Sequence, residues 1–455
     1  MFSQTRRGVL QIAGSSTLLL APGLAACAPR GAGDVAPPAA KIVPGTKVSV
    51  LIKGGFYSEP QDVNTVQPVL KGWQQTTGLT IDPVDVGTDT ANEKLQVLMA
   101  SGTPPDVVGL GTSQDPLGML LLGNALVPLD PLIKRDKFDL SDHFPYSLEH
   151  YRARNTQWGM PQAANPVVMF HNRDLLTRAG LQPPPASWKA PGWDWNDFVA
   201  SAQKMNRPEG TEEDPRSPIF GAGVTDNEFK TAAIAVWSHG GELFDKEFTK
   251  CTLDSPQAVE GLQFLSDLVN RHRVNATPAQ MQGTNIRTLF RTGRVGLLGW
   301  GQALAFVDRI EEDKPGFAWG VHAFPKGRAG RFTVTVGSAY ALIKAGTHQT
   351  EAWELVKFLS GREFLRVVSR DGRGGISPRK SVMAELTKVP SLPSGFLEAT
   401  DLGESARRWP LLARWPEIAT ILGNEVKRLW PGDVAVRQLA SEMVTQINSL
   451  LKDRI

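Results

Sequence analysis

The chain has 455 residues, of which 41% are hydrophobic and 21% are charged, and its formal net charge at pH 7 is +3. This length allows two lobes or domains of ordinary size, and the composition is typical of a soluble globular protein. The small net charge leaves no basic stripe that follows a phosphate backbone, which argues against a nucleic-acid partner. The 12 tryptophans, beside only 4 tyrosines, offer flat apolar faces that suit sugar rings, although most of them are expected in the core.

The N-terminal segment, residues 1–26, has the features of a secretory signal peptide. Two arginines, Arg6 and Arg7, precede an apolar stretch, and small residues stand before Cys27. The sequence L-A-A-C at 24–27 resembles the bacterial lipobox, in which the cysteine is lipidated and becomes the new N-terminus. Residues 5–10 also resemble a twin-arginine signal, so the Sec and twin-arginine export routes both stay open.

The segment that follows, residues 27–41, is rich in Ala, Pro and Gly and has no hydrophobic period, which predicts a flexible tether. The body beyond it contains Cys251 as its one cysteine, so no structural disulfide is expected within it. No later apolar run is long enough to span a bilayer, and we therefore expect a soluble body that is tethered to the membrane by lipid.

The first part of the body alternates strand and helix patterns. Strands are predicted over 47–53 and 79–86, and helices over 66–76 and 92–100. In open α/β sheets, ligands bind beyond the carboxyl ends of the strands. Residues that follow such ends are therefore candidate cleft walls.

The stretch 157–181 marks a change from one sheet to another. It contains the loop Trp158 to Pro161, an apolar run over 166–170 that predicts a buried strand, and a helix that ends at Gly180. Further on, either Asp194 or Asn196 is expected to cap a helix.

These residues resemble the extracellular solute-binding family 1 of ABC-type importers, which includes sugar binders. The family's loop, strand and helix around its first crossover correspond to residues 158–181, and its glycine-proline-aspartate motif corresponds to 101–110. Residues 289–300 and 372–380 match two later family segments. Since these moderate matches occur in the family's order from about residue 47 to the C-terminus, their combination is specific.

The resemblance implies an α/β, two-lobed periplasmic-binding-protein-like fold of type II, in which each lobe is a mixed sheet flanked by helices and three crossovers form the hinge. The N-terminal lobe is expected over 42–161 plus 340–378, and the C-terminal lobe over 162–339 plus 379–455. Residues 391–451 are predicted to be mostly helical.

The candidate ligand contacts are aromatic residues near strand and helix ends, polar loop residues, and an arginine between glycines in the third crossover. Sugar binding needs flat apolar faces for the ring and polar groups for its hydroxyls. The resemblance implies that an aromatic residue at the end of the strand 295–300 stacks on a sugar. For every candidate, core packing or an exposed loop or capping role stays open as the alternative. These candidates are Tyr57, Glu59, Asp115, Asn165, Trp237, Trp300, Tyr340 and Arg373.

Motifs that carry enzymatic chemistry were not found in the sequence. It contains no H-E-x-x-H metal motif, no G-x-S-x-G nucleophile elbow, no complete dinucleotide fingerprint and no Walker loop. We therefore predict no catalytic residue, no metal and no cofactor.

The prediction is a monomeric, lipid-anchored receptor outside the cytoplasmic membrane that binds a carbohydrate and delivers it to an ABC permease. An alternative ligand is a glycerophosphodiester or another phosphorylated polyol, suggested by Tyr57, Glu59, Tyr340 and Arg373 together. An alternative of another class is a secreted glycan-cleaving enzyme on a two-lobed scaffold.

Overall fold

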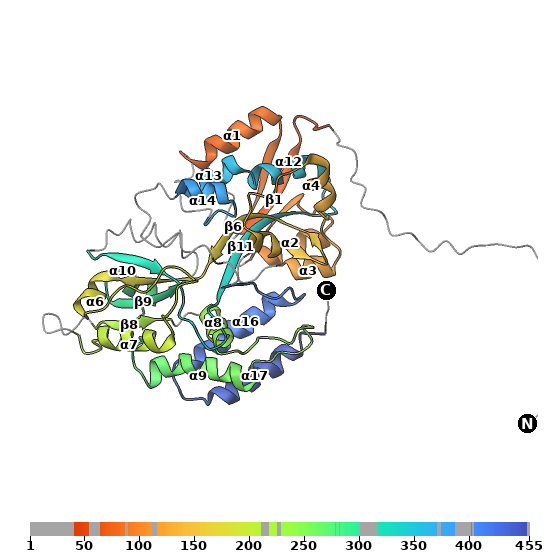
Figure 1. Cartoon of the computed structure of the whole chain (residues 1–455). Helices are drawn as coiled ribbons and strands as arrows, with labels where there is room; N and C mark the ends of the chain where they lie inside the picture. Colours follow the sequence, from red (N-terminus) through yellow and green to blue (C-terminus); the bar gives the residue numbers. More distant parts are fainter. Residues whose placement is uncertain are drawn as a thin grey trace, which may run out of the picture.

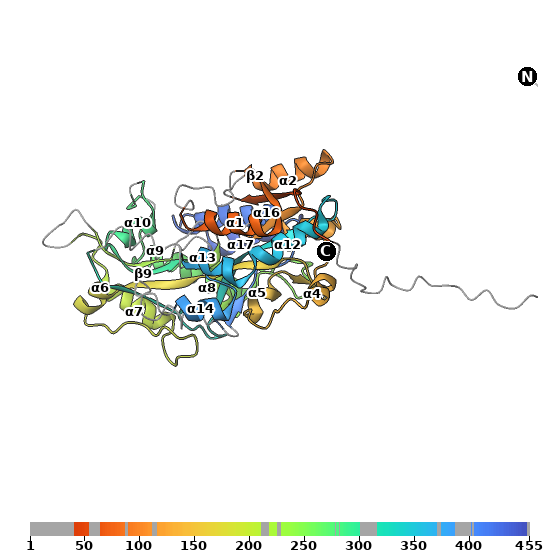
Figure 2. The ribbon, with the colours of Figure 1, turned by 90° about the horizontal axis from the view of Figure 1, so that it is seen from above.

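The computed structural model describes residues 41–53, 64–86, 90–111, 116–210, 218–224, 229–277, 279–281, 283–300, 316–370, 375–386, 402 and 405–452. They form two lobes, each with its own sheet. The lobes meet where the paired strands β6 and β11 pass from one lobe to the other (Figure 1). Seen from above, α6 and α10 lie at one end of the molecule and α4 at the other (Figure 2). The two-lobed α/β fold that the sequence predicts is confirmed.

The N-terminal lobe is built on one mixed sheet in the order β12-β11-β3-β1-β2, with β6 paired to β11. β1 pairs in parallel with β2 and with β3, whereas β11 runs antiparallel to β3 and to β6. Its strands are β1 (Lys47–Lys53), β2 (Thr80–Val86), β3 (Val107–Gly111), β6 (Met160–Pro166), β11 (Thr333–Leu342) and β12 (Ala406–Arg407).

Helices cover both faces of this sheet, which explains why β1 and β3 are apolar on both sides. Leu70, Trp353 and Phe364 pack on one face, and Leu95 and Leu120 pack on the other. The helices of the first face are α1 (Val66–Thr77), α4 (Asp130–Asp136), α12 (Gln349–Leu359) and α13 (Arg362–Arg370). Those of the second are α2 (Ala91–Ala100) and α3 (Leu117–Leu122), and α5 (Pro145–Glu149) leads into the hairpin of β4 (Arg152–Ala153) and β5 (Thr156–Gln157).

The C-terminal lobe has a four-stranded sheet in the order β10-β7-β9-β8. Its strands are β7 (Val168–Asn172), β8 (Phe220–Gly223), β9 (Val295–Trp300) and β10 (Trp319–His322). Its helices are α6 (Arg173–Arg178), α7 (Trp195–Met205), α8 (Lys230–Ser238), α9 (Pro256–Asn270), α10 (Ile286–Arg291), α16 (Trp415–Val426) and α17 (Val436–Asn448).

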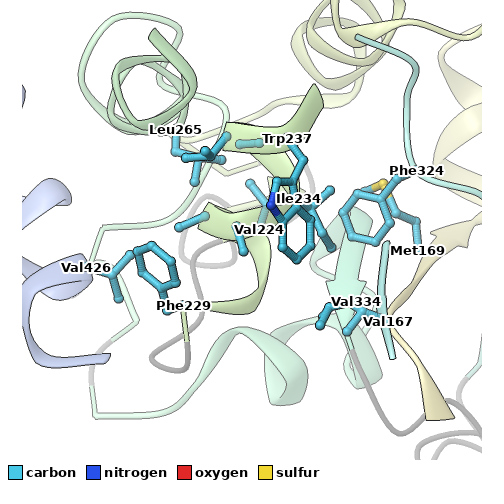
Figure 3. Close-up of a cluster of buried hydrophobic side chains, with 14 of the residues drawn as sticks. Val167, Met169, Val224, Phe229, Ile234, Trp237, Leu265, Phe324, Val334 and Val426 are labelled. Carbon is cyan, nitrogen blue, oxygen red and sulfur yellow. The ribbon is translucent and has the colours of Figure 1, made fainter. Parts of the chain in front are cut away.

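Helix α8 lies at the centre of this lobe. All nine of its residues are buried, because the segment is apolar around most of its circumference. Figure 3 shows Ile234 of α8 in a cluster with Val224, Leu265 and Val426, which come from three other parts of the lobe. Apolar side chains thus meet here from segments that are far apart in the sequence.

Three chain segments run side by side at the junction of the lobes. β6 pairs with β11, and the amide of Ala164 in β6 donates to the carbonyl of Ile376 at 2.9 Å. The boundaries expected after residues 161 and 339 fall inside β6 and β11, so both strands extend the N-terminal sheet into the junction.

Two segments near the C-terminus differ from their expected places. Residues 406–407, expected within a mostly helical region, form β12 beside β11, where Thr333 pairs with Ala406. Residues in α14 (Lys380–Leu386), expected in the C-terminal lobe, bind the N-terminal lobe, since the Ser381 hydroxyl donates to Asp142 Oδ2 at 2.7 Å. Neither contact follows from local sequence, because the first joins residues 73 positions apart and the second joins residues 239 positions apart.

Within the part of the chain that the structure describes, no helix is long and apolar enough to cross a membrane.

Candidate functional site

The N-terminal sheet has a topological switch point between β1 and β3. From β1 the chain passes through α1 to β2 on one side, and it returns through α2 to β3 on the other. The carboxyl ends of β1 and β3, Lys53 and Gly111, therefore lie at the position where open α/β sheets bind ligands in a crevice. The predicted contacts Tyr57, Glu59 and Asp115 follow these ends and lie outside the described residues.

Gly111 lets the crossover strand β11 approach the end of β3 closely. Its φ is +119°, and a Cβ atom there would lie 2.2 Å from the carbonyl oxygen of Gly337. Ser338 pairs with Gly111 across the two strands, and its hydroxyl donates to the side-chain oxygen of Gln162 in β6. The edge of the sheet and the two crossover strands thus form one hydrogen-bonded unit.

Asn165 joins the first crossover to the third. Its Oδ1 accepts a hydrogen bond from the amide of Ile376 at 2.8 Å. Gly375, with φ +68°, lies so close that its Cβ would be 2.3 Å from the same oxygen. Asn165 is half-buried at the junction of the lobes, and its contact with a ligand stays a prediction.

Tyr340 is a core residue of the N-terminal lobe in this structure. Only 3% of its surface is exposed, and it packs with the cluster that contains Met160 and Leu342. In this structure its side chain packs in the core of that lobe, and its binding role remains a prediction.

Trp300 is the last residue of β9, where its backbone pairs with Val168. The segment that follows, 301–315, lies outside the described residues, as does Arg373. The position of Trp300 at a strand end agrees with the sequence prediction, whereas stacking of its ring on a sugar stays a prediction.

Trp237 lines an open cavity of about 420 Å³ between the lobes. Only 4% of its surface is exposed, and it also belongs to the core cluster shown in Figure 3. The cavity reaches from α8 to the β4–β5 hairpin, and neither Lys53 nor Gly111, the described ends of β1 and β3, is among its lining residues.

The ribbon of β6 and β11 separates this cavity from Asn165. Side chains alternate along β11, so Tyr340 and Val336 face one side, and Asn165 lies with them because it pairs with Val336. On the other side, a Cβ atom at Gly337 would lie 2.9 Å from the Tyr151 hydroxyl. Tyr151 directly precedes the hairpin that lines the cavity, so the structure does not bring Trp237 and Asn165 together.

Two adjacent arginines connect the lobes beside the cavity. Arg408 donates to the carbonyl oxygens of Glu149 at 2.5 Å and Arg152 at 3.2 Å. The Arg407 guanidinium lies 5.7 Å from the ring centre of Trp237 in the other lobe.

Burial, together with the neighbouring Arg408 guanidinium, lowers the pKa of His150 to about 4, so this imidazole is neutral at pH 7. This arginine pair is not among the residues that the sequence predicts as ligand contacts, because the pattern over 391–451 favoured helices. The proline at 410, two residues after Arg408, was the signal against a helix.

The described residues contain no group of three or more His, Cys, Asp or Glu side chains that could hold a metal ion.

Comparison with known proteins gives one family match that covers most of the chain. Residues 57–363 match the sequence model described as bacterial extracellular solute-binding protein. A Brucella abortus (strain 2308) protein named as a binding protein is 24% identical over 386 residues, which is 83% of this chain and 87% of that protein.

Solved structures with the same fold cover almost the whole body. An ABC substrate-binding protein from Listeria monocytogenes, solved in complex with cycloalternan, has a TM-score of 0.73 and 21% identity, and the match covers 89% of this chain and 98% of that one. A solute-binding protein from Thermotoga lettingae, bound to α-D-tagatose, has a TM-score of 0.71 and 19% identity, over 89% and 100% of the two chains. At these identities the likeness establishes the fold.

Proposed function

Since this chain belongs to the family of bacterial extracellular solute-binding proteins, we propose that it is the substrate-binding component of an ABC importer and captures a carbohydrate between its lobes. The observation that carries the proposal is the architecture. Two lobes with separate sheets and cores meet at three crossover segments, and such a junction permits closure on a ligand by hinge motion at a few residues. The chain itself makes and breaks no bond in this function.

A carbohydrate is the ligand class that the neighbours favour. The Listeria and Thermotoga proteins were solved with a sugar bound, and this chain has Trp300 at the end of a strand of its C-terminal lobe. A flat indole binds the C–H face of a sugar ring, and the polar candidates Glu59, Asp115 and Asn165 supply acceptors for its hydroxyls. Closure of the lobes excludes water and strengthens those polar contacts.

The ligand screen is a titration followed by intrinsic tryptophan fluorescence, with monosaccharides, oligosaccharides and glycerophosphodiesters as separate arms. We expect saturable binding of a sugar without product formation. If only the glycerophosphodiesters bind, the ligand class is a phosphorylated polyol and not a carbohydrate. Turnover of a glycoside would overturn the receptor function in favour of an enzyme.

A Trp300→Ala variant is expected to weaken sugar binding by about 1 to 3 kcal/mol, because the stacking surface is lost. The matched control is Trp73→Ala, since Trp73 stacks on Phe358 at the surface of the N-terminal lobe, 5.2 Å between ring centres. Unchanged affinity in a folded Trp300→Ala protein would remove Trp300 from the site.

We also propose that the chain is anchored outside the cytoplasmic membrane by a lipid on Cys27. The lipobox-like sequence at 24–27 supports this. In cells fed radiolabelled palmitate, the wild-type chain should carry the label and sediment with membranes, and a Cys27→Ala variant should do neither. A labelled Cys27→Ala chain would contradict the anchor, and blocking the twin-arginine translocase separates the two export routes.

A further inference from the structure

The cavity beside Trp237 has the composition of a binding site in its own right. The β4–β5 hairpin of the N-terminal lobe forms one wall, and the end of α8 with the loop 242–248 of the C-terminal lobe forms the other. Four of its lining side chains are cationic and two are anionic, so its net charge is positive. The charged lining residues are Arg152, Arg154, Arg407, Arg408, Glu149 and Glu242.

Two buried donors in the lining have no hydrogen-bond partner among the described residues. They are Nε of Arg152 and the indole Nε1 of Trp409. The surface of Trp409 is only 6% exposed, whereas Arg152 is half-buried and its Nε forms an ion pair with Glu149 Oε1 at 3.6 Å. A buried donor without an acceptor costs about 1 to 3 kcal/mol, so an acceptor on a bound molecule stabilises this arrangement.

Two tryptophan rings give the cavity an apolar side. The lining rings of Trp237 and Trp409 have centres 6.3 Å apart and planes at 45° to each other, and Trp415 packs behind Trp409, outside the lining, at 5.3 Å. Aromatic faces of this kind accept the C–H surface of a sugar ring. Arginine forks bind the planar oxygens of a carboxylate or the oxygens of a phosphate, often through two parallel hydrogen bonds.

We propose that this cavity is a second binding site, separate from the crevice at the ends of β1 and β3, and that it takes a small sugar carrying a carboxylate or a phosphate group. The ring lies against the tryptophans, and the anionic group accepts from Arg152 and Arg154 on the hairpin. This site differs from the crevice in its described lining residues and lies on the other face of the β6–β11 ribbon.

The test is calorimetric titration of the full mature chain with sodium glucuronate, with glucose 6-phosphate, with neutral glucose and with inorganic phosphate. We expect saturable binding of glucuronate if the site takes a carboxylate, or of glucose 6-phosphate if it takes a phosphate. In either case binding should weaken at higher salt. No binding of either acidic sugar at about 10 mM, or equally tight binding of neutral glucose, would overturn the proposal. Binding of inorganic phosphate alone would reduce the site to an ion site and overturn the sugar assignment.

Variants locate the binding. Arg152→Gln is expected to weaken it about 10-fold or more, as for the loss of a charge-assisted hydrogen bond, and Trp409→Phe to weaken it while keeping a ring. Arg154→Gln should weaken it less, because Arg154 is exposed at the hairpin tip with φ +51°. The matched control is Arg273→Gln, since Arg273 is also exposed, has φ +54° and lies outside the cavity.

Separation from the crevice is tested with Trp300→Ala. This variant should bind the acidic sugar as the wild type does, even though it binds the crevice ligand more weakly. Equal loss of the acidic sugar in Trp300→Ala, or no loss in Arg152→Gln, would place the binding elsewhere. Thermal melts of each variant confirm that the chain is folded before its affinity is compared.

Discussion

Asp106 is a buried carboxylate that ties three segments of the N-terminal lobe together. It accepts hydrogen bonds from the amide and the hydroxyl of Ser49, both at 2.9 Å, and from the amide of His348 at 3.0 Å. Burial raises the pKa of Asp106, but the bonds from Ser49 and His348 outweigh it and lower this pKa below its usual value. The charged form is therefore the one that the fold stabilises.

An Asp106→Asn variant should lose about 1 to 3 kcal/mol of unfolding free energy at pH 7, because the amide supplies one fewer acceptor to these donors. Since the folded pKa is lowered, this stabilisation is present above about pH 4, the unfolded pKa, and is lost as pH falls through the folded pKa. Urea unfolding at several pH values measures it. Asp82→Asn, at an exposed position of β2, is the control, and equal stability of the two variants would contradict the role of Asp106.

Buried histidines make the fold sensitive to acid. Burial lowers the pKa of His143 and of His150 to about 4, and that of His171 to about 3. His322, which contacts His171 with 3.0 Å between their Nδ1 atoms, also has its pKa held well below the usual value by burial. Both partners of this pair are neutral at pH 7, with one donating to the other.

The unfolded chain takes up these protons at about pH 6.5, whereas the folded chain binds them only at lower pH. Stability is therefore fully present above about pH 6.5 and falls as pH drops toward 4, by up to about 1.4 kcal/mol per pH unit for each such histidine. Urea midpoints measured between about pH 7 and pH 4.5 should decline steadily. A flat profile over this range would show that these imidazoles are accessible to protons in the folded state.

At the scale of elements, local sequence patterns decided most helices and strands. The predicted strand 47–53 is β1, and the predicted helices 66–76 and 92–100 are α1 and α2 to within a residue at each end. The sequence predicted that either Asp194 or Asn196 caps a helix. In the structure Asp194 caps α7 and forms a capping box with Asp197. These features depend on neighbours within a few residues, and a sequence pattern is sufficient to predict them.

The contact of β3 with β11 depends on a glycine that no periodicity identifies. A Gly111→Ala variant should lose several kcal/mol, roughly 3 or more, because its methyl group would overlap the Gly337 carbonyl and the position also requires a positive φ. Gly102→Ala is the matched control, since Gly102 has φ +74° with no atom within 4 Å of the added Cβ, and it should lose only about 1 kcal/mol.

Urea unfolding of both glycine variants separates the steric overlap from the backbone strain that they share. Equal losses in Gly111→Ala and Gly102→Ala would mean that β11 moves away from β3 at little cost, and that the junction is less tightly packed than the structure indicates.

At the scale of the whole molecule, the separate cores of the lobes make hinge closure the expected response to a ligand. We expect the radius of gyration in solution scattering to fall when the sugar identified by fluorescence saturates the protein. The control is the Trp300→Ala variant at the same sugar concentration, which should stay nearer the ligand-free value. An unchanged radius in a fully saturated wild-type protein would contradict closure.

The sequence by itself determined most of the elements, because they depend on periodicity and short-range chemistry, and the order of its motifs gave the family resemblance that implied the two-lobed class. The tertiary structure alone decided which residues meet at the junction. The bond between Asn165 and Ile376 spans 211 positions and the one between Arg408 and Glu149 spans 259. Such contacts are set by how the two sheets pack and by which face of β6 and β11 each side chain occupies. For this reason Trp237, expected in the cleft, lies beside the arginines of a different cavity.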